Sequence, residues 1–545
     1  MRKLQELKDR YRALRAGLEN ANLKGTFALA ASLRRFFSDP ITPQRAQEEI
    51  KALLAGREER FLELARTRIY ARPGSPYLKL LRRAGCEYAD LEGNVRRHGL
   101  EPTLERLAGE GVYLTAEEAK GKKDVVRGEQ TFRVSPKDLE NSASSPGFVT
   151  ESSGTTNAPL RSASSLNLLV CAALNKSIFF SAHDLFSRSH AVYDAILPSG
   201  GGIRNILMNA KIEVSTDRWF ARTIPHDSAL ASWYHYFVTY VIVACGKLFG
   251  PGFPRPEFVE TEDVHPIVDW VIENRRQGKL CCIATAASNA VRIARVAWEM
   301  GASLEGTKFV ANGEPLTEGK RELIERARAT SISVYGFEDL AFRVGYGCAN
   351  PVYTDELHIN RHMVALIPHP SPLAYDGLPI HPLLFTSLHP ATPRFFLNVE
   401  NGDYATLVKR DCGCPLEKIG FTLHIHHVRS YEKFTSEGMN YFYGDLFDLF
   451  EKILPSEFGG GPGDYQLVEE EDDNGQTRLS LLVHPRLGDL DEVRLLARLK
   501  ETLARGDRSS RFMANVWQSA GTFRVRRQVP YSSPRGKISP LHILQ

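Results

Sequence analysis

Apolar residues recur with helical spacing through residues 1–70, between densely placed Arg, Lys and Glu side chains. Residues three or four positions apart lie on one face of a helix, so this pattern predicts amphipathic helices. The pattern stops at residues 72–76, which read Arg-Pro-Gly-Ser-Pro. Proline and glycine interrupt regular structure, so a break is expected there. We predict a helical N-terminal region over residues 1–130, to which the sequence assigns no role.

Between residues 131 and 428 short apolar runs alternate with amphipathic stretches. An apolar run that begins at Lys279 precedes a helical pattern over residues 291–300, and a second apolar run begins at Lys308. The order strand, helix, strand is typical of α/β folds. The pattern changes again beyond residue 428, with helical periodicity, a glycine-rich break at residues 459–463 and a strand-like segment. This second pattern predicts a small α+β domain over residues 429–545.

Composition and charge narrow the classes of function. With 43% hydrophobic and 25% charged residues, the 545-residue chain has the composition of a globular protein. Its net charge of +4 comes from 69 basic and 65 acidic residues, a balance that argues against nucleic acid or a membrane surface as a partner. No apolar run is long enough to span a membrane, and the charged residues 1–10 lack the apolar core of a secretion signal. We expect a cytoplasmic protein, of undetermined oligomeric state.

Residues 150–161 read Thr-Glu-Ser-Ser-Gly-Thr-Thr-Asn-Ala-Pro-Leu-Arg. A glycine lets the backbone approach a ligand closely, and short hydroxyl side chains donate hydrogen bonds to phosphate oxygens. Taken alone, such a run is also compatible with an ordinary surface loop. The candidate phosphate-binding residues are Ser152, Ser153, Gly154, Thr155 and Thr156.

Two further candidate segments follow predicted strands. Open α/β sheets bind ligands at the carboxyl ends of their strands, where both segments are expected. Adjacent carboxylates beside a phosphate loop require a cation between them, and Mg²⁺ takes one or two carboxylates together with phosphate oxygens. The first segment is Gly313, Glu314 and Pro315, and the second contains Tyr335, Gly336, Glu338 and Asp339.

Two more candidates stand alone in the sequence. Asp403 follows a glycine and is suited to accept hydrogen bonds from the hydroxyls of a ribose. Lys537 lies in the glycine- and serine-containing segment 532–537 near the end of the chain. Each of these residues, taken singly, also fits a solvated surface position.

In their order, these motifs resemble the adenylate-forming (acyl-CoA synthetase-like) superfamily. Within it, the doubled serine before Gly154 and the sequence Gly-Met-Asn-Tyr-Phe at residues 438–442 are similar to phenylacetate:coenzyme A ligases. The resemblance extends from about residue 134 to the end of the chain. It implies a large multi-sheet adenylation domain over residues 131–428, a hinge near residues 429–432 and a small mobile C-terminal domain.

The resemblance also implies a reaction and residue roles. ATP activates a carboxylic acid to an acyl-adenylate, which then passes the acyl group to a thiol, usually that of coenzyme A. Residues 152–156 would hold phosphates, residues 313–315 would line the adenine, and Asp403 would bind the ribose. Arg429 would lie at the junction with the C-terminal domain, and Lys537 would reach the α-phosphate. Glu338 and Asp339 would act with Mg²⁺.

Several positions depart from the superfamily pattern. Asn157 replaces a glycine, Leu160 replaces a lysine and has Arg161 beside it, and Glu338 precedes Asp339 where a threonine and a glutamate are usual. Three functions therefore stay open. The first is an acid:CoA ligase, the second transfers the activated acid to a carrier-protein phosphopantetheine or an amine, and the third is a non-catalytic nucleotide-binding relative.

For the acid substrate, the sequence predicts only a broad chemical class. An aromatic run is a candidate wall for an aryl or mid-sized apolar acid, although aromatic runs also occur in protein cores. These residues are Trp233, Tyr234, His235 and Tyr236.

Spacing of the cysteines raises a separate metal hypothesis. Eight cysteines in 545 residues are too few and too scattered for a disulfide framework. Cys348, His358, Cys412 and Cys414 together would make a closed Cys3His zinc site of the structural type. The alternative is that these thiols are simply buried.

Overall fold

The computed structural model describes residues 23–543 with internal gaps. The gaps are residues 142–146, 152–160, 223–228, 261–262, 376–377, 431–434, 437–438, 441–442, 472–476, 504–522 and 533–535, and the last two residues also lie outside the description. The predicted phosphate-binding residues 152–156 therefore lie outside the described residues.

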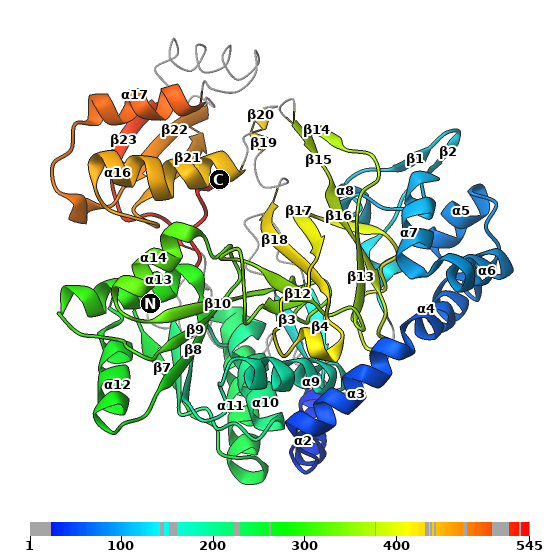
Figure 1. The fold of residues 1–545 in the computed structure, drawn as a ribbon, viewed down its shortest axis with the longest axis horizontal. Helices are drawn as coiled ribbons and strands as arrows, with labels where there is room; N and C mark the ends of the chain where they lie inside the picture. Colours follow the sequence, from blue (N-terminus) through cyan, green and yellow to red (C-terminus); the bar gives the residue numbers. More distant parts are fainter. Residues whose placement is uncertain are drawn as a thin grey trace, which may run out of the picture.

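A mixed sheet of twelve strands forms the centre of the molecule (Figure 1). Its order is β13-β16-β17-β18-β12-β11-β10-β9-β8-β5-β6-β7. The parallel half consists of β5 (Ser189–Tyr193), β6 (Arg218–Arg222), β7 (Pro256–Val259), β8 (Cys281–Ala286), β9 (Lys308–Asn312) and β10 (Thr330–Tyr335). The antiparallel half consists of β11 (Gly345–Gly347), β12 (Leu357–Ile359), β13 (Val364–Pro368), β16 (Pro382–Ser387), β17 (Val399–Lys409) and β18 (Leu423–Ser430).

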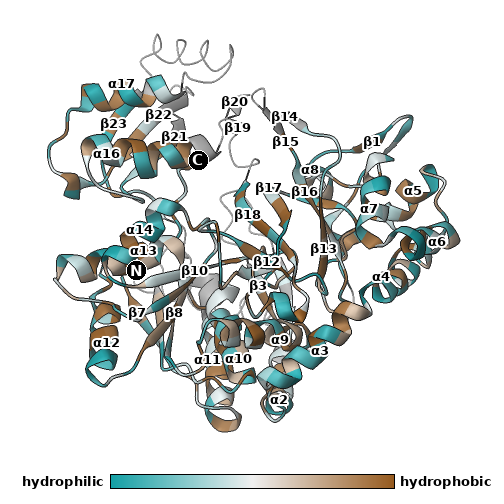
Figure 2. Ribbon diagram, in the orientation of Figure 1, coloured by the Kyte–Doolittle hydropathy of each residue, from teal (hydrophilic) through white to brown (hydrophobic). Residues whose placement is uncertain are grey.

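Helices cover both faces of the parallel half. One face packs on α12 (His265–Arg276), α13 (Ala287–Glu299) and α14 (Glu318–Arg326), and the other on α9 (Leu166–Ala182) and α10 (Gly200–Lys211). In β8, Cys281 and Ile283 pack on the first face, whereas Cys282 packs on the second. This two-sided burial explains why the parallel strands read as continuous apolar runs, such as β8 in Figure 2.

The predicted strand–helix–strand segment is confirmed at residues 281–312, where α13 connects β8 to β9. The two strands pair in parallel, and β9 pairs in parallel with β10 after α14. The α/β fold class is therefore confirmed.

The N-terminal region is helical, as predicted, but it does not have a core of its own. Leu33, Phe61 and Leu104 belong to the same buried cluster as Phe385 and Ile425 of the antiparallel half. The helices are α2 (Leu23–Phe37), α3 (Pro43–Ala55), α4 (Arg57–Ala65), α5 (Pro76–Arg83), α6 (Tyr88–His98), α7 (Leu100–Gly109) and α8 (Ala116–Ala119), with the π-helical turn η1 (Arg66–Tyr70) after α4. This region therefore supports the sheet that carries the candidate site.

The C-terminal segment contains a small sheet and helices, as the sequence predicts, and has a separate core cluster. The sheet order is β23-β22-β21-β24. Its strands are β21 (Tyr465–Glu471), β22 (Thr477–Val483), β23 (Phe523–Arg527) and β24 (Leu541–Ile543). The helical elements are α15 (Tyr443–Asp448), the π-helical turn η5 (Leu449–Ile453), α16 (Leu454–Phe458) and α17 (Glu492–Leu503). Figure 1 shows this unit above α13 and α14.

Smaller elements complete the fold. The two-stranded pairs are β1 (Val125–Arg127) with β2 (Gln130–Phe132), β3 (Gly147–Glu151) with β4 (Arg161–Ser165), β14 (Leu373–Tyr375) with β15 (Leu378–Ile380), and β19 (Thr435–Ser436) with β20 (Met439–Asn440). The 3-10 turns are η2 (Pro136–Leu139), η4 (Glu417–Ile419) and η6 (Pro485–Leu487), and α11 (Ala229–Phe249) is the longest described helix.

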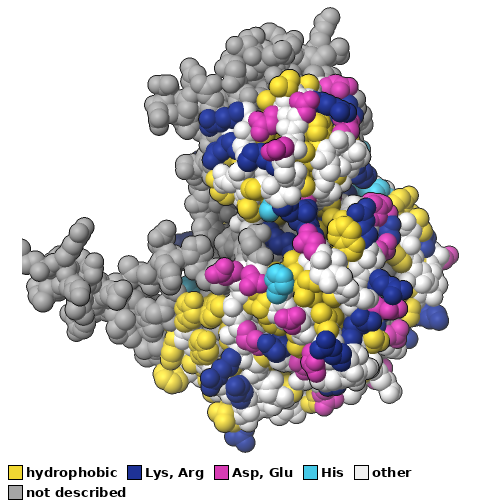
Figure 3. Space-filling view, turned by 90° about the vertical axis from the view of Figure 1, so that its left-hand side faces the viewer, with side chains coloured by type: hydrophobic (Ala, Val, Ile, Leu, Met, Phe, Trp, Pro, Cys, Tyr) yellow, Lys and Arg dark blue, Asp and Glu magenta, His cyan; other side chains and the backbone are white. Residues whose placement is uncertain are grey.

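Two surface observations bear on partners. In the described part of the chain, no helix combines the length and apolar character needed to cross a membrane. On the face drawn in Figure 3, Lys and Arg side chains are interspersed with Asp and Glu side chains. This mixture agrees with the balanced charge of the sequence.

Candidate active site and metal centre

The candidate site lies at the carboxyl end of β10, where the sheet changes from parallel to antiparallel. β10 pairs in parallel with β9 and antiparallel with β11. Open α/β sheets bind their ligands beyond the carboxyl ends of the strands, where this turn lies. Gly336 follows β10, and a Cβ atom there would come within 2.6 Å of the Phe342 carbonyl oxygen. The turn after Tyr335 therefore requires glycine.

Glu338 and Asp339 follow this turn but have different partners. Arg204 of α10 donates to both carboxylate oxygens of Glu338, at 2.7 and 3.0 Å, and Thr150 of β3 donates to the same group. Asp339 is paired with Arg394, while burial raises the pKa of its carboxyl group. Each acid thus has a cationic partner, which removes the electrostatic conflict expected from two adjacent carboxylates.

Asp403 and Tyr335 lie together at the same end of the sheet. The Tyr335 hydroxyl donates to Asp403 Oδ2 at 2.6 Å, and the Asn401 amide nitrogen donates to Oδ2 at 2.8 Å. Burial, and then the charge of Asp403, raise the pKa of Tyr335 well above its usual value, so the phenol stays protonated. Asn401, which the sequence reading did not single out, thus helps to fix the orientation of the carboxylate.

Lys537 reaches the end of the neighbouring strand β9. A Cβ atom at Gly313 would lie 2.5 Å from Lys537 Cε and 3.0 Å from Nζ, so the lysine side chain packs directly on this glycine. Gly313 also has a φ of +82°, which favours glycine. Two candidates separated by 224 positions in the sequence therefore touch.

The backbone around Lys537 is held by both parts of the molecule. Arg292 of α13 donates to the Gly536 carbonyl oxygen at 3.2 Å. Gly536 has a φ of +82°, and a Cβ atom there would overlap the amide oxygen of Asn289, at 2.1 Å. On the C-terminal side, the Gln466 amide donates to the carbonyl oxygens of Tyr531 and Ser539. Sequence reasoning missed all of these contacts because none has a local motif.

Glu314 has a role that the sequence did not predict. Its carboxylate accepts hydrogen bonds from the Ser288 amide at 2.8 Å and the Ser288 hydroxyl at 2.7 Å, at the start of α13. It also pairs with Lys320 at 3.2 Å, and Lys320 lies 3.5 Å from Glu451 of η5. Pro315 contributes its carbonyl oxygen to the same lysine, at 3.1 Å. The side chain of Glu314 is therefore engaged within the protein, which leaves backbone atoms of residues 313–315 as the candidate adenine contacts.

Lys320 and its two glutamates form a buried triad between α14 and the C-terminal unit. The side chain of Lys320 is 2% exposed, and those of Glu314 and Glu451 are 6% and 7% exposed. Burial disfavours the charge of Lys320, but the carboxylates outweigh it and raise its pKa. Phe447 of α15 lies 5.3 Å from the amine. Removal of the lysine would leave two buried carboxylates facing one another.

Arg429 is the candidate residue for the junction with the C-terminal domain. It donates to Asp355 Oδ2 at 2.9 Å from the end of β18. Its guanidinium group is 5.9 Å from the ring centroid of Phe447 in α15. The residue therefore connects the large sheet with the first helix of the C-terminal unit.

The two strands that flank the predicted phosphate loop, β3 and β4, belong to the described residues, whereas residues 152–160 do not. β3 and β4 form an antiparallel hairpin that ends at the pair Glu151 and Arg161. Thr150 contacts Glu338, as noted above, so this hairpin lies beside the β10 turn.

The aromatic run was expected to line an acid pocket, and its described side chains contact α2 and β7. It lies in α11, whose Tyr234 hydroxyl is 3.3 Å from Thr26 of α2. The ring of Tyr236 packs at 6.2 Å from Phe258 of β7. A cavity beside β8, β9 and β10 is instead lined by residues of α9, α10 and the sheet, and His235 and Tyr236 are not among them. The side chain of Trp233 lies outside the described residues.

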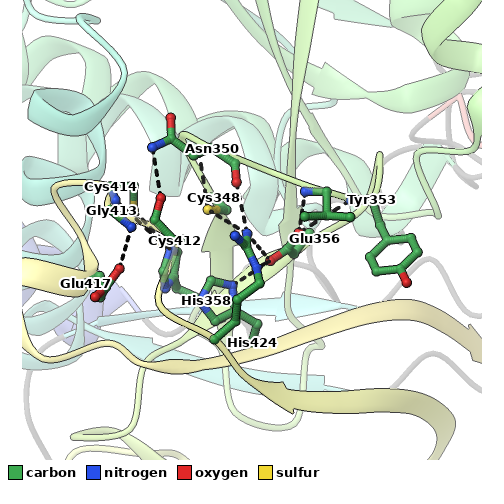
Figure 4. A network of polar contacts seen from close by, with 12 residues as sticks. Cys348, Asn350, Tyr353, Glu356, His358, Cys412, Gly413, Cys414, Glu417 and His424 are labelled. Atoms are coloured by element: carbon green, nitrogen blue, oxygen red, sulfur yellow. Dashed lines mark hydrogen bonds and ion pairs between the residues drawn. The ribbon is translucent and has the colours of Figure 1, made fainter.

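The four predicted zinc ligands converge in space. Cys348 follows β11, His358 lies in β12, and Cys412 and Cys414 lie in the loop before β18 (Figure 4). All four donor atoms lie within 4.8 Å of one another. With zinc–sulfur bonds of about 2.3 Å, tetrahedral donors are about 3.8 Å apart, so the spacing suits a four-coordinate metal.

Surrounding groups also favour metal binding. The Nδ1 atom of His358 lies 2.6 Å from the carbonyl oxygen of Phe421, and a proton on Nδ1 leaves Nε2 to face Cys414 at 3.1 Å. Hydrogen bonds, the largest from the Cys348 thiol, lower the pKa of Cys414. Arg410 lies 3.8 Å from the Cys348 sulfur and offsets negative charge on the thiolates.

Comparisons with known proteins find structural similarity at low sequence identity. No protein-family model matches the chain, and no curated protein matches it. A 2-hydroxyisobutyryl-CoA ligase in its postadenylation state is similar with a TM-score of 0.48 and 12% identity, over 91% of this chain and 89% of that one. McyG A-PCP complexed with phenylalanyl-adenylate has a TM-score of 0.40 and 11% identity, over 75% and 66% of the two chains.

The buried triad generates a prediction for stability. Lys320→Met should destabilise the protein by about 3–5 kcal/mol, because it leaves the Glu314 and Glu451 carboxylates buried without their cation. Lys452→Ala is the control, since Lys452 pairs with Asp448 on the surface, where both side chains are 58% exposed. Thermal and urea unfolding of both variants measure the difference. Equal stability of the two variants would contradict the structural role of the triad.

Proposed function

We propose that this chain is an AMP-forming acid:thiol ligase that activates a carboxylic acid with ATP and transfers the acyl group to coenzyme A. The observation that carries the proposal is the packing of Lys537 on Gly313. It brings a cation from the C-terminal unit to the carboxyl end of β9, beside the Tyr335 and Asp403 cluster. The order of motifs in the sequence supports the same reaction. The phenylacetate branch, and an aryl or apolar acid, stay predictions from the sequence.

Each step of this reaction has a candidate group. A carboxylate that attacks the α-phosphate of ATP needs positive charge to offset charge build-up, and Lys537 supplies it at this position. Mg²⁺ would supply further positive charge when bound with the nucleotide, and Asp339 is the candidate ligand. Asp403, oriented by Asn401, is the candidate acceptor for the ribose hydroxyls.

A mobile C-terminal domain would fit the contacts seen here. Lys537 comes from a unit with its own core, so movement of that unit would carry the lysine away from Gly313. Such a movement would vacate the site for the thiol after the adenylate has formed. Arg429, which contacts both parts, is the candidate hinge residue.

A second candidate function is favoured by the partners of the two acids. Glu338 is paired with Arg204 and Asp339 with Arg394, so both carboxylates are engaged within the chain. A relative that binds nucleotide without catalysis would have this arrangement if neither acid released its arginine to bind Mg²⁺. Transfer to a carrier protein or an amine is the third candidate and differs from the first in the acceptor alone.

Pyrophosphate release across a panel of carboxylic acids, with and without coenzyme A, distinguishes these functions. Acid-dependent release with formation of an acyl-CoA is the expected result. Release without a thioester would favour a carrier protein or an amine as acceptor. Nucleotide binding without release for any acid would favour the non-catalytic relative.

Lys537→Ala should abolish acid-dependent pyrophosphate exchange but spare thioester formation from a supplied acyl-adenylate. The reason is that the lysine offsets charge in the first step alone. Lys279→Ala is the matched control, because Lys279 is exposed near the amino end of β8. Unchanged exchange in Lys537→Ala would exclude this role.

We also infer that the Cys348, His358, Cys412 and Cys414 cluster binds a structural zinc ion. All four positions of a tetrahedral ion are taken by protein atoms, so no site is left for a substrate. The ion would tie β11 and β12 to the loop before β18 and so stabilise the antiparallel half of the sheet.

Metal analysis of the purified protein should return about one zinc ion per chain. Cys414→Ala should lose the ion and lower the melting temperature, because the ligand set is no longer complete. Cys245→Ala is the control, since Cys245 is a buried cysteine of α11 that belongs to no cluster of potential ligands in the described residues. A metal-free wild-type protein with an unchanged melting temperature after chelation would overturn the inference.

A further inference from the structure

The backbone of Gly536, one residue before Lys537, lies against helix α13. One nitrogen of Arg292 donates to the Gly536 carbonyl oxygen at 3.2 Å and to the Asn289 side-chain oxygen at 2.9 Å. Asn289 and Arg292 are three positions apart in α13, so they lie on one face of the helix. Figure 1 shows α13 below the C-terminal unit. Two side chains of α13 therefore meet the backbone beside Lys537.

Asn289 is fixed by hydrogen bonds that lead back into the central sheet. Its amide nitrogen donates to the Thr285 hydroxyl at 3.2 Å, and this hydroxyl donates to the Tyr193 carbonyl oxygen of β5 at 2.8 Å. Asn289 and Thr285 are both fully buried, so solvent does not compete for these groups. Because its nitrogen donates to Thr285, the Asn289 oxygen is held facing Arg292.

The same threonine also holds the other side of the lysine contact. The Asn312 amide donates to the Thr285 carbonyl oxygen at 2.9 Å, at the end of β9. Asn312 directly precedes Gly313, on which Lys537 packs. Thr285 is therefore connected through its hydroxyl to the segment that carries the lysine, and through its carbonyl oxygen to the glycine that the lysine meets.

The fit between Gly536 and Asn289 leaves no room for a side chain. A Cβ atom at Gly536 would lie 2.1 Å from the Asn289 side-chain oxygen and 2.6 Å from its nitrogen. Asn289 therefore limits the shape of the segment that can lie here, and Arg292 binds its carbonyl oxygen.

Other contacts of α13 and α14 hold the C-terminal unit at different places. Arg295 of α13 pairs with Asp464 at 3.3 Å, and Lys320 of α14 lies 3.5 Å from Glu451. Both acids lie before the sheet of the C-terminal unit, far along the chain from Lys537. A lysine side chain is a flexible four-carbon stem, so its amine reaches a fixed point only where its own backbone is held.

We propose that Thr285, Asn289 and Arg292 are positioning residues for the activation of the acid. They act on Lys537 through the backbone beside it and are assigned no contact with the substrate. The inference rests on the proposed function, because Lys537 is assigned there to the first step alone. Loss of these hydrogen bonds should therefore slow adenylate formation and spare the transfer of a preformed adenylate to coenzyme A.

The test measures the two half-reactions separately in variants of Arg292. The probes are phenylacetate and phenylacetyl-adenylate, or the corresponding pair for whichever acid of the panel supports exchange in the wild type. Arg292→Met should lower kcat for pyrophosphate exchange at least about tenfold and leave thioester formation from the adenylate within about twofold of wild type. Arg292→Lys keeps one donor for the Gly536 carbonyl oxygen and should lose less exchange.

Arg276→Met is the matched control. The Arg276 side chain is 75% exposed on α12 and pairs with Glu273 at 3.7 Å, so both half-reactions should match the wild type. An equal loss of both half-reactions in Arg292→Met would indicate a purely structural role and overturn the inference.

A second measurement reports the position of Lys537 without ATP or acid. Acetylation by acetic anhydride, quantified by mass spectrometry of the digested protein, reports how accessible each amine is. Lys452, whose side chain is 58% exposed, is the internal reference. Arg292→Met should raise the acetylation rate of Lys537 relative to Lys452 at least about threefold, because the lysine is no longer held on Gly313. Thermal unfolding shows whether each variant is folded.

The two measurements separate failure of the inference from failure of the proposed function. Faster acetylation of Lys537 in Arg292→Met supports the inference even if no acid supports exchange in the wild type, in which case the proposed function fails. An unchanged acetylation rate, or unchanged exchange in Arg292→Met, overturns the inference and leaves the proposed function standing.

Discussion

The contact between Lys537 and Gly313 is the constraint on which the candidate site depends. The lysine reaches this glycine because the C-terminal unit packs against α13 and α14. Three contacts hold the C-terminal unit in this position. They are the buried Lys320 triad, the hydrogen bond from Arg292 and the ion pair of Arg295 with Asp464. Burying three charged groups costs desolvation free energy. The triad nevertheless strongly favours one geometry, because any displacement leaves a carboxylate without its cation.

The central sheet determines where the other candidate groups lie relative to this contact. The turn after Tyr335 lies at the carboxyl end of β10, which pairs with β9 on one side and β11 on the other, and Asp403 lies within hydrogen-bond distance of Tyr335. Activation of an acid and the arrival of the C-terminal lysine are therefore proposed at adjacent positions of one sheet. The cysteine cluster is proposed to stabilise the antiparallel half of that sheet.

Sequence patterns were reliable where the determinant is local. Continuous apolar runs predicted the parallel strands because both sheet faces are covered, and the strand–helix–strand segment at residues 281–312 is confirmed. The cysteine spacing predicted a cluster that the structure brings together. The resemblance to adenylate-forming proteins implied a set of site residues, but it could not give their contacts. The residues of the phosphate loop lie outside the description, so their role stays a prediction.

By itself, the sequence determined the α/β fold class, the α+β character of the C-terminal segment and the residue types available for chemistry, because periodicity and motif order are properties of neighbouring positions. Only the tertiary structure decided which of these residues meet. Glu314 pairs with the buried Lys320. Glu338 and Asp339, although adjacent, each pair with a different arginine. The described aromatic side chains of α11 contact α2 and β7. Burial and long-range charge pairing set these outcomes, and neither can be read from adjacent residues.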